Sequence, residues 1–157
     1  MGKQMSHIIK DVRRSLLTAI AFLGLATAQS AVQMRFGYGD GLGLVFGTGV
    51  ENRMRQNLSS RFLAELAPAA PGVALEASLL FKPDLGQYDP SLKGLLPYFG
   101  GGLSGVVGGQ STLGVSFSAG VEALFDPYTG LFAEGTYVYG FADFPKVWRL
   151  GVGVNFR

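Results

Sequence analysis

The chain has 157 residues, no cysteine and one histidine, and it carries 13 basic and 11 acidic residues. Because the histidine is His7, near the N-terminus, the rest of the chain lacks the imidazole and thiolate groups that most nucleophilic enzymes and zinc sites use. Only 15% of the residues are charged, against about 25% in soluble domains, and 24 are glycine, which weakens helices. The composition therefore argues against a helical bundle and against the commonest classes of enzyme.

Residues 1–28 have the pattern of a helical secretory signal peptide. Four basic residues within 3–14 precede an uncharged run at 15–25, and the sequence A-T-A at 26–28 offers small residues for cleavage. The alternative is a retained membrane anchor, since the uncharged stretch continues to residue 33. The strongly apolar part is shorter than the ~20 residues of a spanning helix, so we predict cleavage.

The predicted mature chain, 29–157, has the length of one domain. It contains nine basic and ten acidic residues, so the basic character of the whole chain comes from the leader. This balance gives no reason to expect a nucleic-acid partner.

Eight segments alternate between large apolar residues and small or polar ones, which is the period of β-strands. Turn sequences such as G-D-G at 39–41 and D-P-Y-T-G at 126–130 separate them, and the longest loop spans 83–94. The region 51–67 also fits a helix with Leu58, Phe62, Leu63 and Leu66 on one face. We choose a strand there because an even number of strands closes a barrel more naturally. The predicted strands are 31–39, 42–50, 57–66, 73–82, 95–105, 113–122, 131–140 and 147–157.

The segment 147–157 shows the alternation most clearly. Every second residue from Trp148 to Phe156 is large and apolar, whereas the positions between them are mostly small or polar. Its length matches the ~9–11 residues that a tilted strand needs to cross a bilayer. In a soluble barrel the exposed face would consist largely of glycine and serine, which makes a poor soluble surface. We therefore predict an all-β fold, an eight-stranded antiparallel transmembrane β-barrel whose apolar face contacts lipid.

The candidate site is the interior of this barrel, where charged residues on the polar faces should meet. A hairpin about the 126–130 turn is expected to place Glu122 opposite Glu134. Such a pair fits an acid/base couple, a cation site or a structural network that fills the lumen. We favour the network because no second functional motif accompanies the pair, and we predict no catalytic residue, cofactor or metal. The predicted lumen charges are Arg35, Glu76, Glu122, Glu134 and Arg149, with Arg157 on the same face.

Aromatic residues on the opposite, lipid-facing side are expected to mark the two membrane interfaces. The residues predicted for this role are Tyr38, Tyr98, Tyr137, Tyr139, Trp148 and Phe156.

The chain resembles the small bacterial outer-membrane barrels of the OmpA-barrel, OmpX and OmpW-like kind. The residues that carry the resemblance are P-Y-F-G-G-G at 97–102, G-V-E at 120–122, L-F-A-E-G at 131–135 and L-G-V-G-V-N-F at 150–156. The resemblance implies an outer-membrane location, a packed lumen unlike that of a porin, and contact with outer-membrane lipid and the barrel-assembly machinery.

On this basis we expect a monomeric, non-enzymatic protein with a structural or surface-interaction role in the cell envelope. The alternatives are a narrow passive channel for small apolar solutes and a soluble exported barrel that binds a small apolar ligand.

Overall fold

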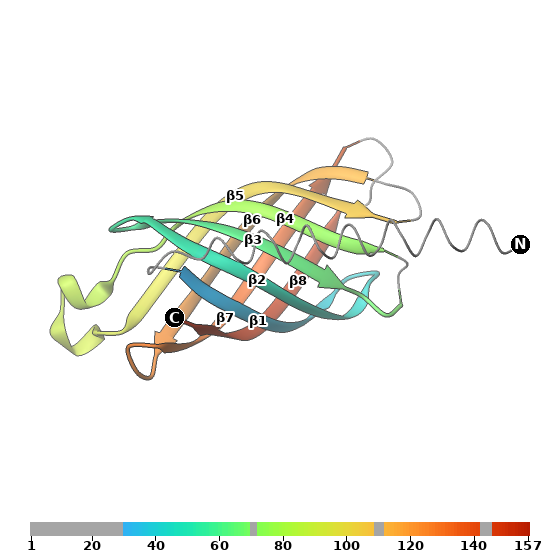
Figure 1. The fold of residues 1–157 in the computed structure, drawn as a ribbon. Helices are drawn as coiled ribbons and strands as arrows, with labels where there is room; N and C mark the ends of the chain where they lie inside the picture. Colours follow the sequence, from blue (N-terminus) through green and yellow to red (C-terminus); the bar gives the residue numbers. More distant parts are fainter. Residues whose placement is uncertain (1–29, 70–71, 109–111, 142–145) are drawn as a thin grey trace, which may run out of the picture.

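The computed structural model describes residues 30–69, 72–108, 112–141 and 146–157, and the predicted signal peptide lies outside them. Eight antiparallel strands account for most of these residues (Figure 1). The β4–β5 loop contains two short 3-10 helices, η1 (Leu85–Gln87) and η2 (Pro90–Leu92). Among the described residues, no helix is both long and apolar enough to span a bilayer. The strands are β1 (Ser30–Gly39), β2 (Gly43–Arg55), β3 (Leu58–Leu66), β4 (Val73–Phe81), β5 (Leu95–Val107), β6 (Thr112–Leu124), β7 (Thr129–Gly140) and β8 (Val147–Phe156).

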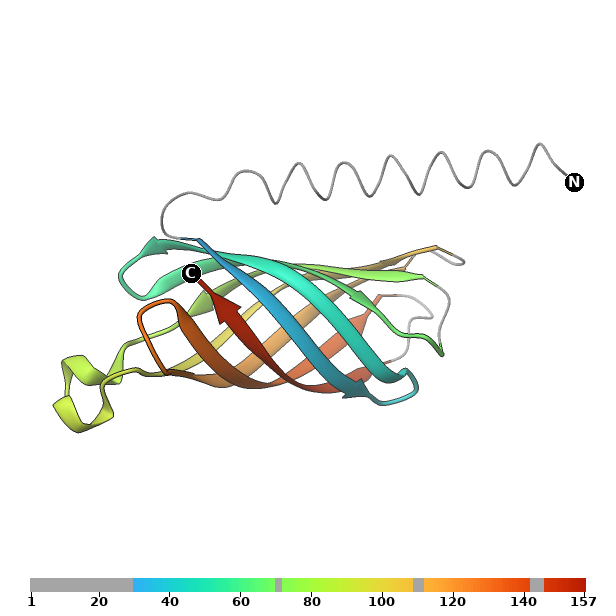
Figure 2. The ribbon, with the colours of Figure 1, turned by 60° about the horizontal axis from the view of Figure 1, so that its bottom comes forward.

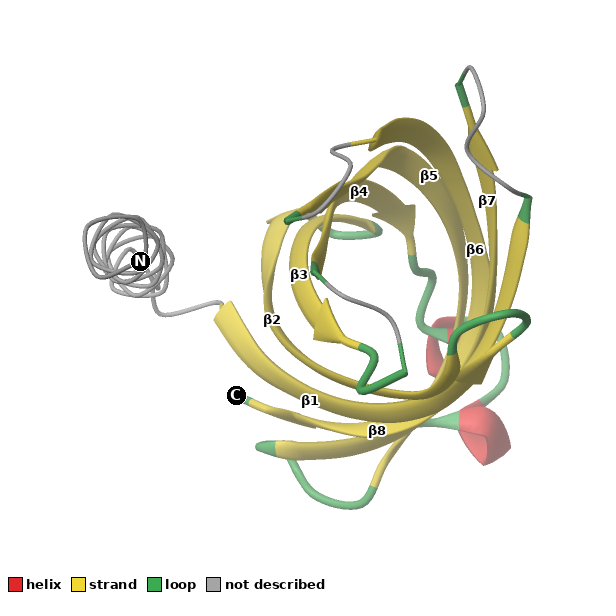
Figure 3. Ribbon diagram, turned by 90° about the vertical axis from the view of Figure 1, so that its right-hand side faces the viewer, coloured by secondary structure: helices red, strands yellow, loops and turns green. Residues whose placement is uncertain are grey.

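The strands form one closed barrel in which each pairs with its neighbours along the chain and β1 pairs with β8 (Figures 2 and 3). Closure leaves no unpaired strand edge, which is what a sheet needs in lipid. We call the end where β1 begins and β8 ends, which also holds the β4–β5 loop, the terminus end, and the end that holds the β1–β2 turn the far end (Figure 2).

The eight predicted strands and the antiparallel barrel are confirmed. The region 51–67, which also fitted a helix, contains the end of β2 and the whole of β3. The alternation of β2 continues past the predicted end at residue 50, so Glu51 faces inward like Val45 and Gly49. This region is a strand and not a helix because β3 is hydrogen-bonded along its length between β2 and β4.

The barrel is apolar outside and polar inside. Large apolar side chains stand outward and exposed on every strand; Phe117 and Leu150, for example, are 59% and 69% exposed. The buried set includes most of the charged residues of the strands, with Arg61 only 1% exposed and Glu122 fully buried. This is the reverse of a soluble barrel and is the arrangement of a barrel whose solvent is lipid.

Glycine lets the wall of this narrow barrel bend where strands approach closely. A Cβ on Gly102 of β5 would fall on the backbone carbonyl oxygen of Ala77 in β4. A Cβ on the outward-facing Gly135 of β7 would instead meet only Leu150, at an ordinary distance of 3.6 Å.

We therefore expect Gly102→Ala to destabilise the barrel by about 1–3 kcal/mol, because the new methyl group overpacks the β4–β5 contact. Gly135→Ala is the matched control and should leave stability nearly unchanged. Urea unfolding of both variants in lipid vesicles, followed by tryptophan fluorescence, measures the difference. Equal stability of the two variants would contradict this account of the strand contact.

Candidate functional site: the charged lumen

Three arginines and three glutamates form a closed ring of ion pairs across the lumen. Each arginine contacts two glutamates and each glutamate contacts two arginines, so charges alternate around the ring. All six side chains are buried, and their formal charges sum to zero. We call this set the charge ring: Arg35, Glu65, Arg149, Glu76, Arg61 and Glu134, in the order in which they are linked.

The ring draws its members from five strands. Arg35 comes from β1, Arg61 and Glu65 from β3, and the other three from β4, β7 and β8. The Arg35 guanidinium lies 3.0 Å from both Glu65 and Glu134. Because the members come from both sides of the barrel, the ring spans the lumen and does not simply line its wall.

Arg61 and Glu134 each form hydrogen bonds with three other residues. Arg61 donates to both carboxylate oxygens of Glu134, to Glu76 at 3.2 Å and to the Ser118 hydroxyl at 3.2 Å. The Thr136 hydroxyl donates to Glu134 at 3.0 Å. Hydrogen bonds of this number are what a buried charge needs to offset its loss of water.

Arg149 completes the ring. Its guanidinium contacts Glu65 and lies 2.7 Å from Glu76. Each of the three ring carboxylates is therefore held by two guanidinium groups, and none is free to act as a base or to hold a metal ion. Among the described residues there is no group of side chains arranged to ligate a metal.

A second neutral cluster lies nearer the terminus end. The Lys82 ammonium sits between Glu51, at 2.8 Å, and Glu122, at 2.7 Å, and the Arg157 guanidinium lies 2.6 Å from Glu122. We call these four residues the Lys82 cluster. Together with the charge ring it fills two successive layers of the lumen with paired charge.

The structure places all five predicted lumen charges inside the barrel but divides them between these two groups. Arg35, Glu76, Glu134 and Arg149 belong to the charge ring, whereas Glu122 belongs to the Lys82 cluster. The prediction that Glu122 faces Glu134 is wrong. In the observed β6–β7 register Glu122 pairs with Phe132 and Glu134 pairs with Gly120, a shift of two residues that keeps both carboxylates inside.

Tyr98 does not lie at the membrane interface, and its prediction there is wrong. The side chain is 4% exposed and points into the lumen, where the Lys82 ammonium lies 4.9 Å from the centre of its ring. Gly120 of the neighbouring strand makes the space, because a Cβ there would lie 2.7 Å from the tyrosine hydroxyl.

The other predicted interface aromatics are on the outer surface. Tyr38, Tyr139 and Trp148 stand exposed towards the far end, and Phe156 stands exposed at the terminus end. Tyr137 is half-buried because its ring packs on Trp148, with 4.6 Å between the ring centres. Their position at the headgroup level of a membrane stays a prediction.

Sequence reasoning missed four of the lumen charges, Glu51, Arg61, Glu65 and Lys82. The signal for three of them was present. Lys82 lies on the same face as Glu76 in the predicted strand 73–82. Arg61 and Glu65 alternate with the apolar Phe62, Ala64 and Leu66 in β3. The competing helical interpretation of that region hid the signal there. Glu51 was missed because the predicted second strand ended one residue too early.

Similar folds occur among solved structures. The N-terminal β-barrel domain of Pseudomonas aeruginosa OprF matches with a TM-score of 0.66 and 16% identity, over 82% of this chain and 96% of that one. Neisserial surface protein A matches with a TM-score of 0.59 and 18% identity, over 81% of this chain and 94% of that one. The fold is that of a small outer-membrane β-barrel.

A de novo designed transmembrane β-barrel also matches, with a TM-score of 0.64 and 14% identity, over 83% of this chain and 96% of the design. No family model matches the chain, and no curated protein sequence matches it. The likeness is therefore one of fold.

Proposed function

We propose that the protein is a non-enzymatic barrel of the bacterial outer membrane, with a structural or surface-interaction role and a lumen that does not conduct. The observation that carries the proposal is the charge ring, which crosses the lumen with six paired side chains. An eight-stranded barrel is only wide enough for its interior side chains to fill it. Ions and solutes would have to break buried ion pairs to pass.

The outward apolar face supports the membrane location, and the similarity to outer-membrane barrels supports the choice of membrane. We propose further that the chain reaches this membrane after cleavage of residues 1–28, is inserted by the barrel-assembly machinery and stays monomeric, surrounded by lipid. The soluble ligand-binding alternative is disfavoured because it would leave this face in water.

Planar-bilayer recording tests the closed lumen. The wild-type barrel is expected to give no conductance steps. The double variant Arg61→Ser with Glu134→Ser replaces two ring members of opposite charge with short, neutral side chains. It should give conductance steps, provided that it still shows the heat-dependent gel shift of a folded barrel. The control is Gly135→Ala, whose change faces outward. Steps from the wild-type protein would instead favour the passive-channel alternative.

A further inference from the structure

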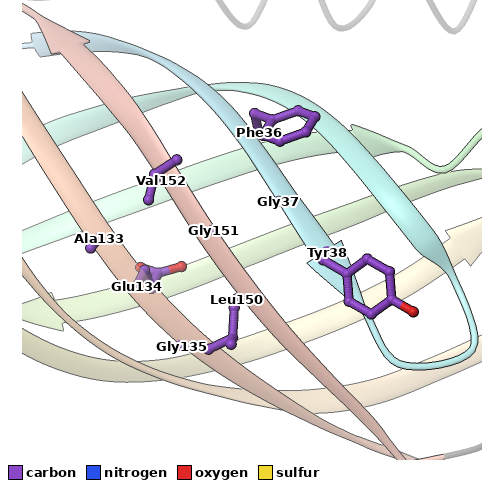
Figure 4. A pocket seen from close by; sticks show the side chains of 9 residues that line it. All are labelled: Phe36, Gly37, Tyr38, Ala133, Glu134, Gly135, Leu150, Gly151 and Val152. Carbon is purple, nitrogen blue, oxygen red and sulfur yellow. The ribbon is translucent and has the colours of Figure 1, made fainter.

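A shallow groove of about 520 Å³ crosses the outer surface of β7, β8 and β1 (Figure 4). One side of the groove is lined by the small residues Ala133 and Gly135 of β7. The other side is lined by larger side chains, those of Leu150 and Val152 of β8 and Phe36 of β1. The outward-facing residues that line it are apolar apart from the Tyr38 hydroxyl. Because this face stands in the membrane under the proposed function, an acyl chain is the occupant that its chemistry fits.

A basic residue lies at the far-end rim of the same two strands. The β7–β8 register pairs Ala133 with Val152, Gly135 with Leu150 and Tyr137 with Trp148. Two residues further towards the rim, the Lys146 ammonium lies 5.3 Å from the centre of the Tyr139 ring. The two strands thus present a cation at the rim, then aromatic rings, then the groove.

This order matches that of a membrane lipid with a negatively charged headgroup. Lys146 precedes Leu150 by four residues, or about 13 Å along an extended strand. A chain lying in the groove would bring its headgroup to the level of the lysine, where tyrosine and tryptophan also favour the interface. We propose that the groove with Lys146 is a binding site for an anionic phospholipid.

The chain contains a single tryptophan, and it is Trp148, which lies between the groove and Lys146. Its fluorescence therefore reports the lipid next to this part of the outer surface, and a preference between two lipids there reports the site. The refolded full-length protein is placed in phosphatidylcholine vesicles that contain a minor fraction of lipid brominated on its acyl chains. The brominated lipid is either phosphatidylglycerol, which is anionic, or phosphatidylcholine, which is not.

In the wild-type protein, brominated phosphatidylglycerol is expected to compete for the site about fivefold better than brominated phosphatidylcholine, as judged by quenching. That is the change expected from an attraction of about 1 kcal/mol for one basic residue beside anionic lipid. Lys146→Gln should remove the preference. The matched control is Lys93→Gln in the β4–β5 loop at the terminus end, which should keep it.

Two further variants and one control test the groove and the charge of the rim separately. Gly135→Val adds volume to the groove at a position where a Cβ meets only Leu150, at 3.6 Å, and should weaken quenching by both brominated lipids. Ala77→Val, outward-facing on β4, should not. Asp40 is the acidic residue among the described residues of this rim, and its amide donates to the Trp148 carbonyl at 2.8 Å. Asp40→Asn is therefore expected to raise the preference for the anionic lipid.

Equal quenching by the two brominated lipids in the wild-type protein would overturn the inference and leave the membrane barrel standing. An equal loss of preference in the Lys146 and Lys93 variants would overturn it too, because general surface charge would then be responsible. Quenching by neither lipid, together with no heat-dependent gel shift, would count against the proposed membrane location itself.

Discussion

Glu134→Ala is expected to destabilise the folded barrel by about 3–5 kcal/mol, because it removes one member of a buried network and leaves its partners charged. Arg35 and Arg61 would lose a shared carboxylate, and the charge ring would change from neutral to an excess of one positive charge. The Thr136 hydroxyl would also lose its acceptor. Urea unfolding in lipid vesicles, with gel mobility of unboiled samples as a second measure of the folded fraction, gives the size of the loss.

The double variant Arg61→Met with Glu134→Ala separates the ion pair from the loss of volume. If the two residues stabilise the barrel through each other, the double variant should lose clearly less than the sum of the two single variants. Strictly additive losses would show that the pair is not coupled. Wild-type stability of Glu134→Ala alone would refute the structural role of the ring.

Val152→Arg is expected to destabilise the barrel by about 2–4 kcal/mol, because it places a charge on the lipid face near the middle of β8. The side chain stands outward and is 55% exposed. In a soluble protein an exposed valine of this kind would accept arginine with little effect. The loss of stability, measured by urea unfolding in vesicles, therefore shows whether lipid or water surrounds the barrel.

Val107→Arg is the matched control, since Val107 is also outward-facing and is 53% exposed but is the last residue of β5, at the far end. Arginine near the interface costs only about 0–1 kcal/mol, so this variant should stay close to wild type. A neutral effect at both positions would place the outer face in water and return attention to a soluble barrel.

The faces of the strands were predictable from the sequence because a strand repeats every two residues. In β8 the alternation from Trp148 to Phe156 assigns each side chain to lipid or lumen without knowledge of its partners. The composition then decided which face is outside, since a surface of glycine and serine with few charges suits a packed interior better than water. The number of strands followed from the turns between the alternating segments, together with the preference for an even number that decided the ambiguous region 51–67.

Alternation does not tell the lumen face from the lipid face where both faces carry apolar or aromatic residues, as they do at the start of β5. Leucine, proline, tyrosine and phenylalanine follow one another at 95–99, so the sequence does not say which way Tyr98 points. The answer depends on other strands, because Gly120 of β6 leaves room for the ring and Lys82, directly after β4, provides a cation against it.

The partners inside the lumen were likewise decided only by the tertiary structure. The expected β6–β7 register was shifted by two residues, and because two is the period of a strand, Glu122 and Glu134 stayed inside while each acquired different neighbours. Arg61 and Glu134 are 73 residues apart and meet only because the sheet closes on itself. Outside the start of β5, the sequence alone determined which side chains of the strands face the lumen, since facing is a local property of each alternating strand. Closure and register decided which charges pair, because those depend on all eight strands at once.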